Sequence, residues 1–221
     1  MAKPDDISER ELILRKELAD RTIDMHSTAR NERVAAERSP EILAIGREIS
    51  HLINDEKLEQ ARDRLTTELA KHPDELMFLN FKMILDGLDK PLGDYSRAKT
   101  DGLELIEKAV DQENIYYMMA AINNFGLIAH NEGHDEFSLA MYLIAYHFDN
   151  KALSVLCNLA GWYSRRNRLD QAMNWITRII DNNPNWKTDK EIVTFFSKNE
   201  SLINLRQYDR FKQEVLSEIH K

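Results

Sequence analysis

Residues 156–184 read LCNLAGWYSRRNRLDQAMNWITRIIDNNP, and this stretch decides the fold. Apolar residues recur at helical spacing on both sides of the polar turn Arg166-Asn167-Arg168. Pro184 ends the pattern, because proline disfavours helical geometry in the residue before it. The stretch therefore predicts two helices joined by a tight turn.

A second pattern recurs along the rest of the chain. In it, a small residue is followed four positions later by a residue that is usually larger. The small residues are spaced by 37, 40 and 34 positions, the range of stacked two-helix repeats. Short polar turns fall at 54–57, 90–94, 131–134 and 166–168, with breaks between pairs at 71–74, 112–114, 149–151 and 182–185. This spacing predicts eight helices in four hairpins over residues 41–185. The recurring pairs are Ala61 with Leu65, Ala98 with Gly102, Ser138 with Tyr142, and Ala172 with Ile176.

The last hairpin resembles the tetratricopeptide repeat (TPR) family in the order of its residues. Those that carry the resemblance are Leu159, Ala160, Tyr163, Asp170, Gln171, Ala172, Ile176 and Pro184. The chain departs from the family pattern at Leu156, where tryptophan is frequent, and at Gly102, where a large residue is expected. The resemblance covers about residues 41–185. It implies an all-α, right-handed α-solenoid of about four helix-turn-helix repeats.

Two flanking segments complete the expected organisation. Residues 1–40 are interpreted as a charged amphipathic segment, with one long helix over residues 7–38. Its apolar stripe is thin, so we expect it to pack on the first hairpin, or to join a second copy of the chain in a homodimer. Residues 186–221 are similar to segments that close bacterial TPR arrays and are expected to form capping helices over the apolar edge of the last hairpin.

Composition narrows the classes of function. The chain has 221 residues, a formal net charge of −8 and interspersed acids and bases, which argues against binding of nucleic-acid phosphates. No stretch approaches the roughly 20 apolar residues that span a bilayer, and the first residues lack the apolar core of a signal peptide, so a cytoplasmic location is expected. The single cysteine, Cys157, excludes an internal disulfide and a cysteine-cluster zinc site.

Residues that carry catalysis are not recognisable. His130 and His134 have the spacing of a metal pair, but Gly133 between them indicates a hairpin turn, so the two side chains are not expected to share a helical face. Cys157 is more typical of a small buried residue than of a nucleophile. The sequence also lacks the glycine motifs of nucleotide-binding loops. We therefore expect no enzyme activity, metal or cofactor.

The TPR resemblance implies that the first helix of each hairpin lines a concave groove that binds a peptide. Asparagines there can donate and accept hydrogen bonds at once, and Arg165 could hold a carboxylate. The alternative is a plain solvated inner surface. Large aromatic residues, including Tyr142, Trp162, Tyr163 and Trp175, are interpreted as packing. The predicted groove residues are Asn80, Met83, Asn123, Leu127, His130, Asn131, Ser154, Cys157, Ser164 and Arg165.

Together these patterns predict a non-enzymatic adaptor or scaffold that binds a peptide or protein segment in a helical-repeat groove. Two alternatives stay open. One is a regulatory protein that senses a small molecule or peptide, or an enzyme, on the same scaffold, because a fold does not settle function. The other is a structural protein that assembles with itself through residues 7–38.

Overall fold

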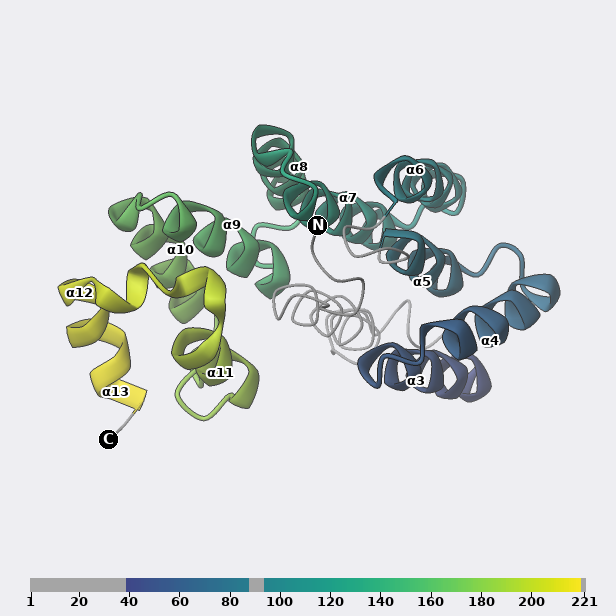
Figure 1. The fold of residues 1–221 in the computed structure, drawn as a ribbon. Coiled ribbons are helices and arrows are strands. Elements are labelled where there is room, and N and C mark those ends of the chain that lie inside the picture. Colours follow the sequence, from purple (N-terminus) through teal and green to yellow (C-terminus); the bar gives the residue numbers. More distant parts are fainter. Residues whose placement is uncertain (1–38, 88–93, 220–221) are drawn as a thin grey trace, which may run out of the picture. The chain divides into compact units, whose positions relative to one another are not determined.

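The computed structural model describes residues 39–87 and 94–219, and each regular element in these two ranges is a helix (Figure 1). The expected helix over residues 7–38 and most of the turn at 90–94 lie outside the described residues. The chain divides into two compact units, Met1–Ser138 and Leu139–Lys221. The described part is therefore all-α, as the sequence predicts.

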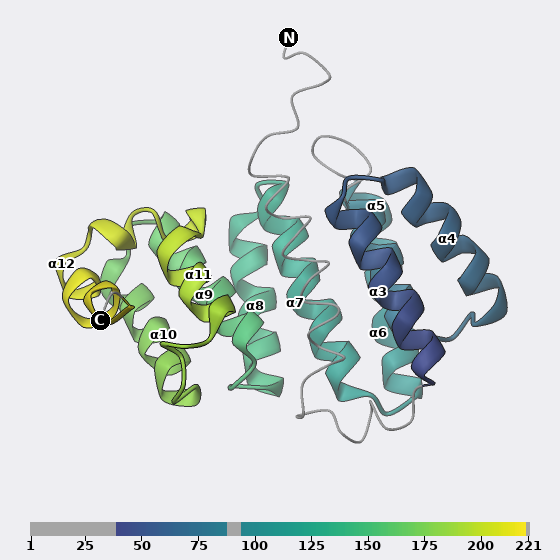
Figure 2. The same cartoon turned by 90° about the horizontal axis from the view of Figure 1, so that it is seen from below.

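The first unit is a series of helices that pack in chain order. Each helix contacts the next along the chain from α3 to α7, and two views show α3 beside α4 and α5 beside α6 (Figures 1 and 2). This packing of consecutive helices is the arrangement that a helical repeat requires. The helices are α3 (Pro40–Asn54), α4 (Leu58–Lys71), α5 (Leu76–Gly87), α6 (Tyr95–Asp111), α7 (Ile115–Asn131) and the first residues of α8 (Asp135–Phe148).

Polar caps fix where several of these helices begin. Before α3, the Ser39 hydroxyl accepts a hydrogen bond from the amide of Ile42 at 3.2 Å, and Pro40 is the first helical residue. Asp94 and Asn114 accept in the same way at the starts of α6 and α7. A side-chain oxygen at this position satisfies an amide that the helix leaves without a partner, so these residues set the register of each helix.

One type of turn ends four of the described helices. Glu56, Glu113, Gly133 and Asn167 have positive φ angles of 61°, 52°, 85° and 56°. In each case the amide of the following residue donates to the carbonyl five positions before it, at 2.7–3.0 Å. This is the Schellman arrangement, which reverses the chain after a helix. Three of these turns lie within predicted hairpins, and the turn at Glu113 joins one hairpin to the next.

Burial in the first unit alternates between helices that are enclosed and helices with one buried stripe. α5 and α7 are buried along most of their length. α4 and α6 bury a narrow face that includes the recurring small residues Ala61 and Ala98, both with no exposed surface. Although α5 and α7 are apolar, the described residues include no helix long and apolar enough to cross a membrane.

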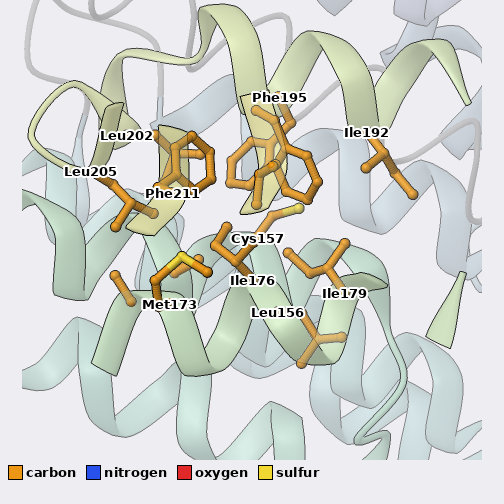
Figure 3. Packing of buried hydrophobic residues seen from close by; sticks show 14 of the residues in the cluster. Leu156, Cys157, Met173, Ile176, Ile179, Ile192, Phe195, Leu202, Leu205 and Phe211 are labelled. Carbon is orange, nitrogen blue, oxygen red and sulfur yellow. The ribbon is translucent and has the colours of Figure 1, made fainter. Parts of the chain in front are cut away.

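The second unit has its own core. α9 packs on α10, and side chains from the end of the chain meet those of both helices (Figure 3). The predicted capping segment is one helix of 9 residues followed by short helical turns, rather than a pair of regular helices. It nevertheless covers the apolar side of the α9–α10 pair. The elements are the second half of α8, α9 (Leu153–Arg165), α10 (Leu169–Asn182), α11 (Lys190–Lys198), η2 (Glu200–Leu202), η3 (Leu205–Gln207), α12 (Asp209–Phe211), η4 (Lys212–Leu216) and α13 (Ser217–Ile219).

Candidate interaction surface

The predicted groove residues are largely enclosed. Asn131, Ser154 and Arg165 are half-buried, and the rest have at most 8% of their surface exposed. These ten residues therefore do not form the row of exposed side chains that an incoming peptide needs. Their role in binding stays a prediction. The buried ones are Asn80, Met83, Asn123, Leu127, His130, Cys157 and Ser164.

In the first unit, the buried asparagines bind each other. Asn124 of α7 donates through Nδ2 to Oδ1 of Asn80 on α5, at 3.0 Å, and neither residue is exposed. A buried amide without a partner costs more free energy than the bond itself gains, so this pair fixes the register of α5 on α7. Asn80 thus has an internal hydrogen bond where the sequence suggested a bond to a peptide.

The two histidines next to the α7–α8 turn have different neighbours. His130 Nδ1 lies 2.6 Å from Oδ1 of Asp135, so the pair spans the turn. The ring of His134 lies against Tyr95, with 4.9 Å between ring centroids. Gly133 separates them with its positive φ, as the sequence indicates. The described residues hold no group of three or more histidine, cysteine or acidic side chains that could bind a metal.

In the second unit, the chain itself covers α9. We call residues 199–205 the C-terminal strap. Asn204 donates through Nδ2 to the carbonyl of Ser164 at 3.0 Å, and the amide of Leu205 donates to the Ser164 hydroxyl at 3.3 Å. The strap therefore supplies donors to the last turn of α9, whose carbonyls have no partner within the helix.

The strap also approaches α9 closely at Gly161. A Cβ at this position would lie 2.5 Å from Oγ of Ser201 and 2.8 Å from its Cβ, closer than carbon atoms approach each other. Cys157, one turn earlier on α9, belongs to the same apolar cluster as Leu202 and Leu205 of the strap (Figure 3). The small residues of α9 thus leave room for the chain's own end. An external peptide could reach this face only by displacing the strap.

Three aromatic rings form a continuous row at the surface of the second unit. Tyr163 of α9 and Trp175 of α10 are stacked, with 6.4 Å between centroids and 24° between planes. Tyr146 of α8 meets Trp175 edge-on at 5.0 Å. All three side chains pack against the core of the second unit and are half-buried, so each keeps part of its surface exposed.

Two exposed arginines lie over these rings. The guanidinium carbon of Arg168 is 4.9 Å from the centroid of Tyr163. That of Arg178 is 5.2 Å from Trp175 and 5.5 Å from Tyr146, whose hydroxyl accepts a hydrogen bond from Arg178. Cation–π contacts of this kind hold the guanidinium groups in place while leaving their outer N–H groups open to solvent. We call Tyr146, Tyr163, Arg168, Trp175 and Arg178 the aromatic–arginine surface.

Local sequence explains much of this geometry. Trp175 and Arg178 are three residues apart on α10, so they lie on one face of that helix. Arg168 follows the positive-φ residue Asn167, and its amide donates to the carbonyl of Tyr163 at 3.0 Å. The turn therefore brings Arg168 back toward the ring of Tyr163. The contact of Tyr146 with Trp175 depends instead on the packing of α8 against α10.

The second unit carries further exposed features. On α8, the apolar residues Leu143, Ile144 and Phe148 are 40%, 42% and 43% exposed. Asp170, the acid nearest in sequence to Arg168, accepts a hydrogen bond from the Tyr208 hydroxyl at 2.6 Å, and this bond raises the pKa of Tyr208. Tryptophan, tyrosine and arginine are the residue types that contribute most to the binding energy of protein interfaces.

Comparisons with known proteins give no information about this surface. No family model matches this chain, and no curated protein or solved structure is significantly similar to it.

Sequence reasoning missed the aromatic–arginine surface. It interpreted the four large aromatics of this region as packing, which describes Tyr142 and Trp162, with 0% and 5% exposed. Tyr163 and Trp175 also pack against the core of the second unit, but they are half-buried and keep part of their surface exposed. The available signal was the arginine that follows each of them, at five and three positions, close enough in sequence to lie over the ring.

Proposed function

We infer that the protein is a non-enzymatic adaptor that binds an acidic segment of a partner protein on the aromatic–arginine surface. The observation that carries this proposal is the row of three contacting aromatic rings with Arg168 and Arg178 held over it. The TPR resemblance supports it, since such arrays serve as binding scaffolds. A right-handed solenoid of about four repeats is part of the same proposal.

The chemistry of the surface favours carboxylates as ligands. Each arginine keeps N–H groups free of its ring, and a guanidinium can bind a carboxylate through two parallel hydrogen bonds. The rings would hold apolar or aromatic side chains beside the acid, next to Leu143 and Phe148. A short segment bound in this way has a dissociation constant around micromolar, about −8 kcal/mol.

The concave groove predicted from the sequence is a second route for the same function. At α9 this route has less support than the aromatic–arginine surface, because the C-terminal strap already donates hydrogen bonds to Ser164 and fills the space beside Gly161. A small-molecule sensor, an enzyme on this scaffold and self-assembly through residues 7–38 stay open as alternatives.

The test starts from a defined probe. A displayed library of short random peptides is selected on the full chain, and the enriched peptides are expected to combine Asp or Glu with an apolar or aromatic residue. Isothermal titration of one enriched peptide then compares the parent with Arg178→Glu. We expect Arg178→Glu to weaken binding at least tenfold, about 1.4 kcal/mol, because it replaces attraction by repulsion at the contact.

Arg47→Glu is the matched control. Arg47 is an exposed residue of α3, so its reversal changes net charge equally and leaves the surface intact. It should bind the peptide within about twofold of the parent, since Arg47 is not one of the residues that form the surface. Enrichment of peptides without acids, or equal affinity of Arg178→Glu and the parent, would reject the proposal.

A further inference from the structure

Helices α5 and α7 of the first unit are enclosed on all sides. Every residue of α5 except Lys82 is buried, and α7 is buried without interruption from Met119 to His130. A helix at a protein surface buries one stripe, as α4 does through Ala61 and Leu65. A helix that is enclosed all round lies between two covering layers. The burial of α5 and α7 therefore requires protein on two opposite sides.

One side of α5 is covered by α6. Lys82 marks this side, because its Nζ lies 3.0 Å from Oε2 of Glu104 on α6. Met77 and Ile84 are five and two positions from Lys82, which places them on the opposite face of the helix. Neither has any exposed surface. The face of α5 that points away from α6 is therefore covered as well.

The same holds for α7. The ring of Phe125 meets Tyr95 of α6, with 5.7 Å between centroids, and Phe137 of α8, with 5.5 Å. Asn123 and Leu127 each lie two positions from Phe125, on the opposite face of the helix. Only 2% and 6% of their surfaces are exposed. The face of α7 that points away from Phe125 and its neighbours is therefore covered too.

The two covered faces form one surface, because α5 and α7 lie side by side. Asn124 of α7 donates to Asn80 of α5. Ile128 of α7 lies against Gly87 of α5, where an added Cβ would be 2.8 Å from Cδ1 of the isoleucine. α6 contacts both helices on one side, and the other side is uncharged and mainly apolar. We call this other side the inner face, and its residues are Met77, Ile84, Ala120, Asn123 and Leu127.

Two segments of the first unit, 1–38 and 88–93, lie outside the described residues. The amide of Asp94 donates to the carbonyl of Asp86 at 3.2 Å, so both ends of 88–93 are held at one end of α5. A segment of this length reaches about 10 Å from that point, whereas Met77 lies about 14 Å away along the helix. Residues 1–38 end at Ser39, the cap of α3, and α3 packs on α5. The longer segment therefore starts next to the inner face.

The sequence of residues 1–38 suits this face. The predicted helix over residues 7–38 would be about 48 Å long, and crossing two packed helices takes about 20 Å. Its apolar residues recur at steps that place them on one side, and its many charges lie on the others. An uncharged surface can bury such a stripe while the charges stay in water. The stripe consists of Ile7, Leu14, Leu18 and Met25.

We propose that residues 1–38 fold back over the inner face and bury Leu14 and Leu18 against α5 and α7. This places the segment on these two helices rather than on the first hairpin, α3 and α4, where the sequence pattern led us to expect it. The groove predicted on α5 and α7 is then closed by the beginning of the chain, as the strap covers α9 in the second unit. An external peptide reaches Asn123 and Leu127 only after this segment leaves. The aromatic–arginine surface takes no part in the contact.

Methyl NMR of the full chain, with labelled isoleucine and leucine side chains, tests the contact directly. NOEs arise only between groups that are close in space, and we expect them from Leu14 or Leu18 to Ile84 and Leu127. In a mixture of labelled and unlabelled chains, filtered NOEs between the two would show that a second copy supplies the cover. That result overturns the proposal, as do NOEs from Ile84 and Leu127 only to residues outside 1–38.

A matched pair of variants tests the same contact through local stability. Leu18→Gln removes an apolar side chain from the stripe, while Lys16→Gln changes the opposite side of the same predicted helix. Hydrogen exchange of the α5 and α7 amides is measured in the full chain. We expect exchange to be at least tenfold faster in Leu18→Gln, because a buried leucine side chain is lost, and within about twofold of the parent in Lys16→Gln. Equal rates in all three proteins mean that this segment does not cover the inner face.

Discussion

Gly133 ends α7 with a φ of 85°, and a Cβ added there would meet no atom within 4 Å. Gly133→Ala therefore tests backbone conformation without any side-chain clash. We expect it to lower the free energy of unfolding by about 1 kcal/mol, the cost of a left-handed conformation for a residue with a Cβ. Urea denaturation at an unchanged m-value measures the effect.

Asn167→Gly is the matched control for this prediction. Asn167 has a φ of 56° at the equivalent turn after α9, so glycine relieves strain there instead of adding it. This variant should be at least as stable as the parent. If Gly133→Ala unfolds at the same urea concentration as the parent, the left-handed turn does not contribute the strain assigned to it.

These turns also show how far single residues can be predicted from sequence. The polar turns that contain Gly133 and Asn167 are visible because both residue types favour the left-handed region. Glu56 and Glu113 adopt the same conformation, although glutamate has no such preference. Their conformation is imposed by the packing of the helices on each side, which local sequence does not encode.

At the scale of elements, Gly161 and Ser201 test whether the C-terminal strap is closely packed on α9. Gly161→Ala adds a helix-forming residue but places its Cβ 2.5 Å from Oγ of Ser201. We expect a net loss of about 1–2 kcal/mol, because overpacking outweighs the gain in helix propensity. Urea denaturation of the full chain measures this loss.

Ser201→Gly supplies the control, since it removes the two Ser201 atoms that the new methyl group would clash with. The double variant should be more stable than the sum of the two single effects, by about 0.5–3 kcal/mol of coupling free energy. Additive effects would mean that the strap moves away from α9 at little cost.

The helices themselves are well anticipated by sequence. The recurring small residues and the polar turns predict consecutive helical pairs, and the described helices pack in this way. The strap is not anticipated, because Leu202 and Leu205 show that the segment is buried but do not show where. A serine and a glycine on α9 look the same whether a partner or the chain's own end lies against them.

The candidate site is equally hard to predict from local sequence. Tyr163 and Trp175 are residue types typical of a core, and only the arrangement of α8, α9 and α10 leaves them partly exposed. Arg178 could be placed near Trp175 from helical spacing alone. Its contact with Tyr146, which lies 32 residues earlier, required the folded chain.

At the scale of the whole molecule, the net charge of the chain and the charge of the aromatic–arginine surface have opposite signs. The chain carries a formal charge of −8, while the aromatic–arginine surface carries two exposed arginines. Salt screens charges beyond about 8 Å at physiological ionic strength, so the local arginines decide contacts at the surface. A long polyacidic chain would still meet repulsion from the rest of the molecule. The surface therefore suits a compact acidic motif with one or two carboxylates beside apolar residues.

The end of the chain completes the core of the second unit, and deleting residues 188–221 tests this directly. The deletion removes Ile192, Phe196 and Phe211, all with at most 1% of their surface exposed, from the cluster that they form with α9 and α10. The apolar side of the remaining pair would then face water. We expect the truncated chain to aggregate, as shown by light scattering after size-exclusion chromatography, because terminal repeats need a covering segment to stay soluble. Ile203→Ser, at a position of the strap that is 56% exposed, changes the same segment without opening the cluster and should stay as soluble as the parent. A soluble truncated chain that keeps the helical content of its remaining residues would show that α9 and α10 do not need this cover.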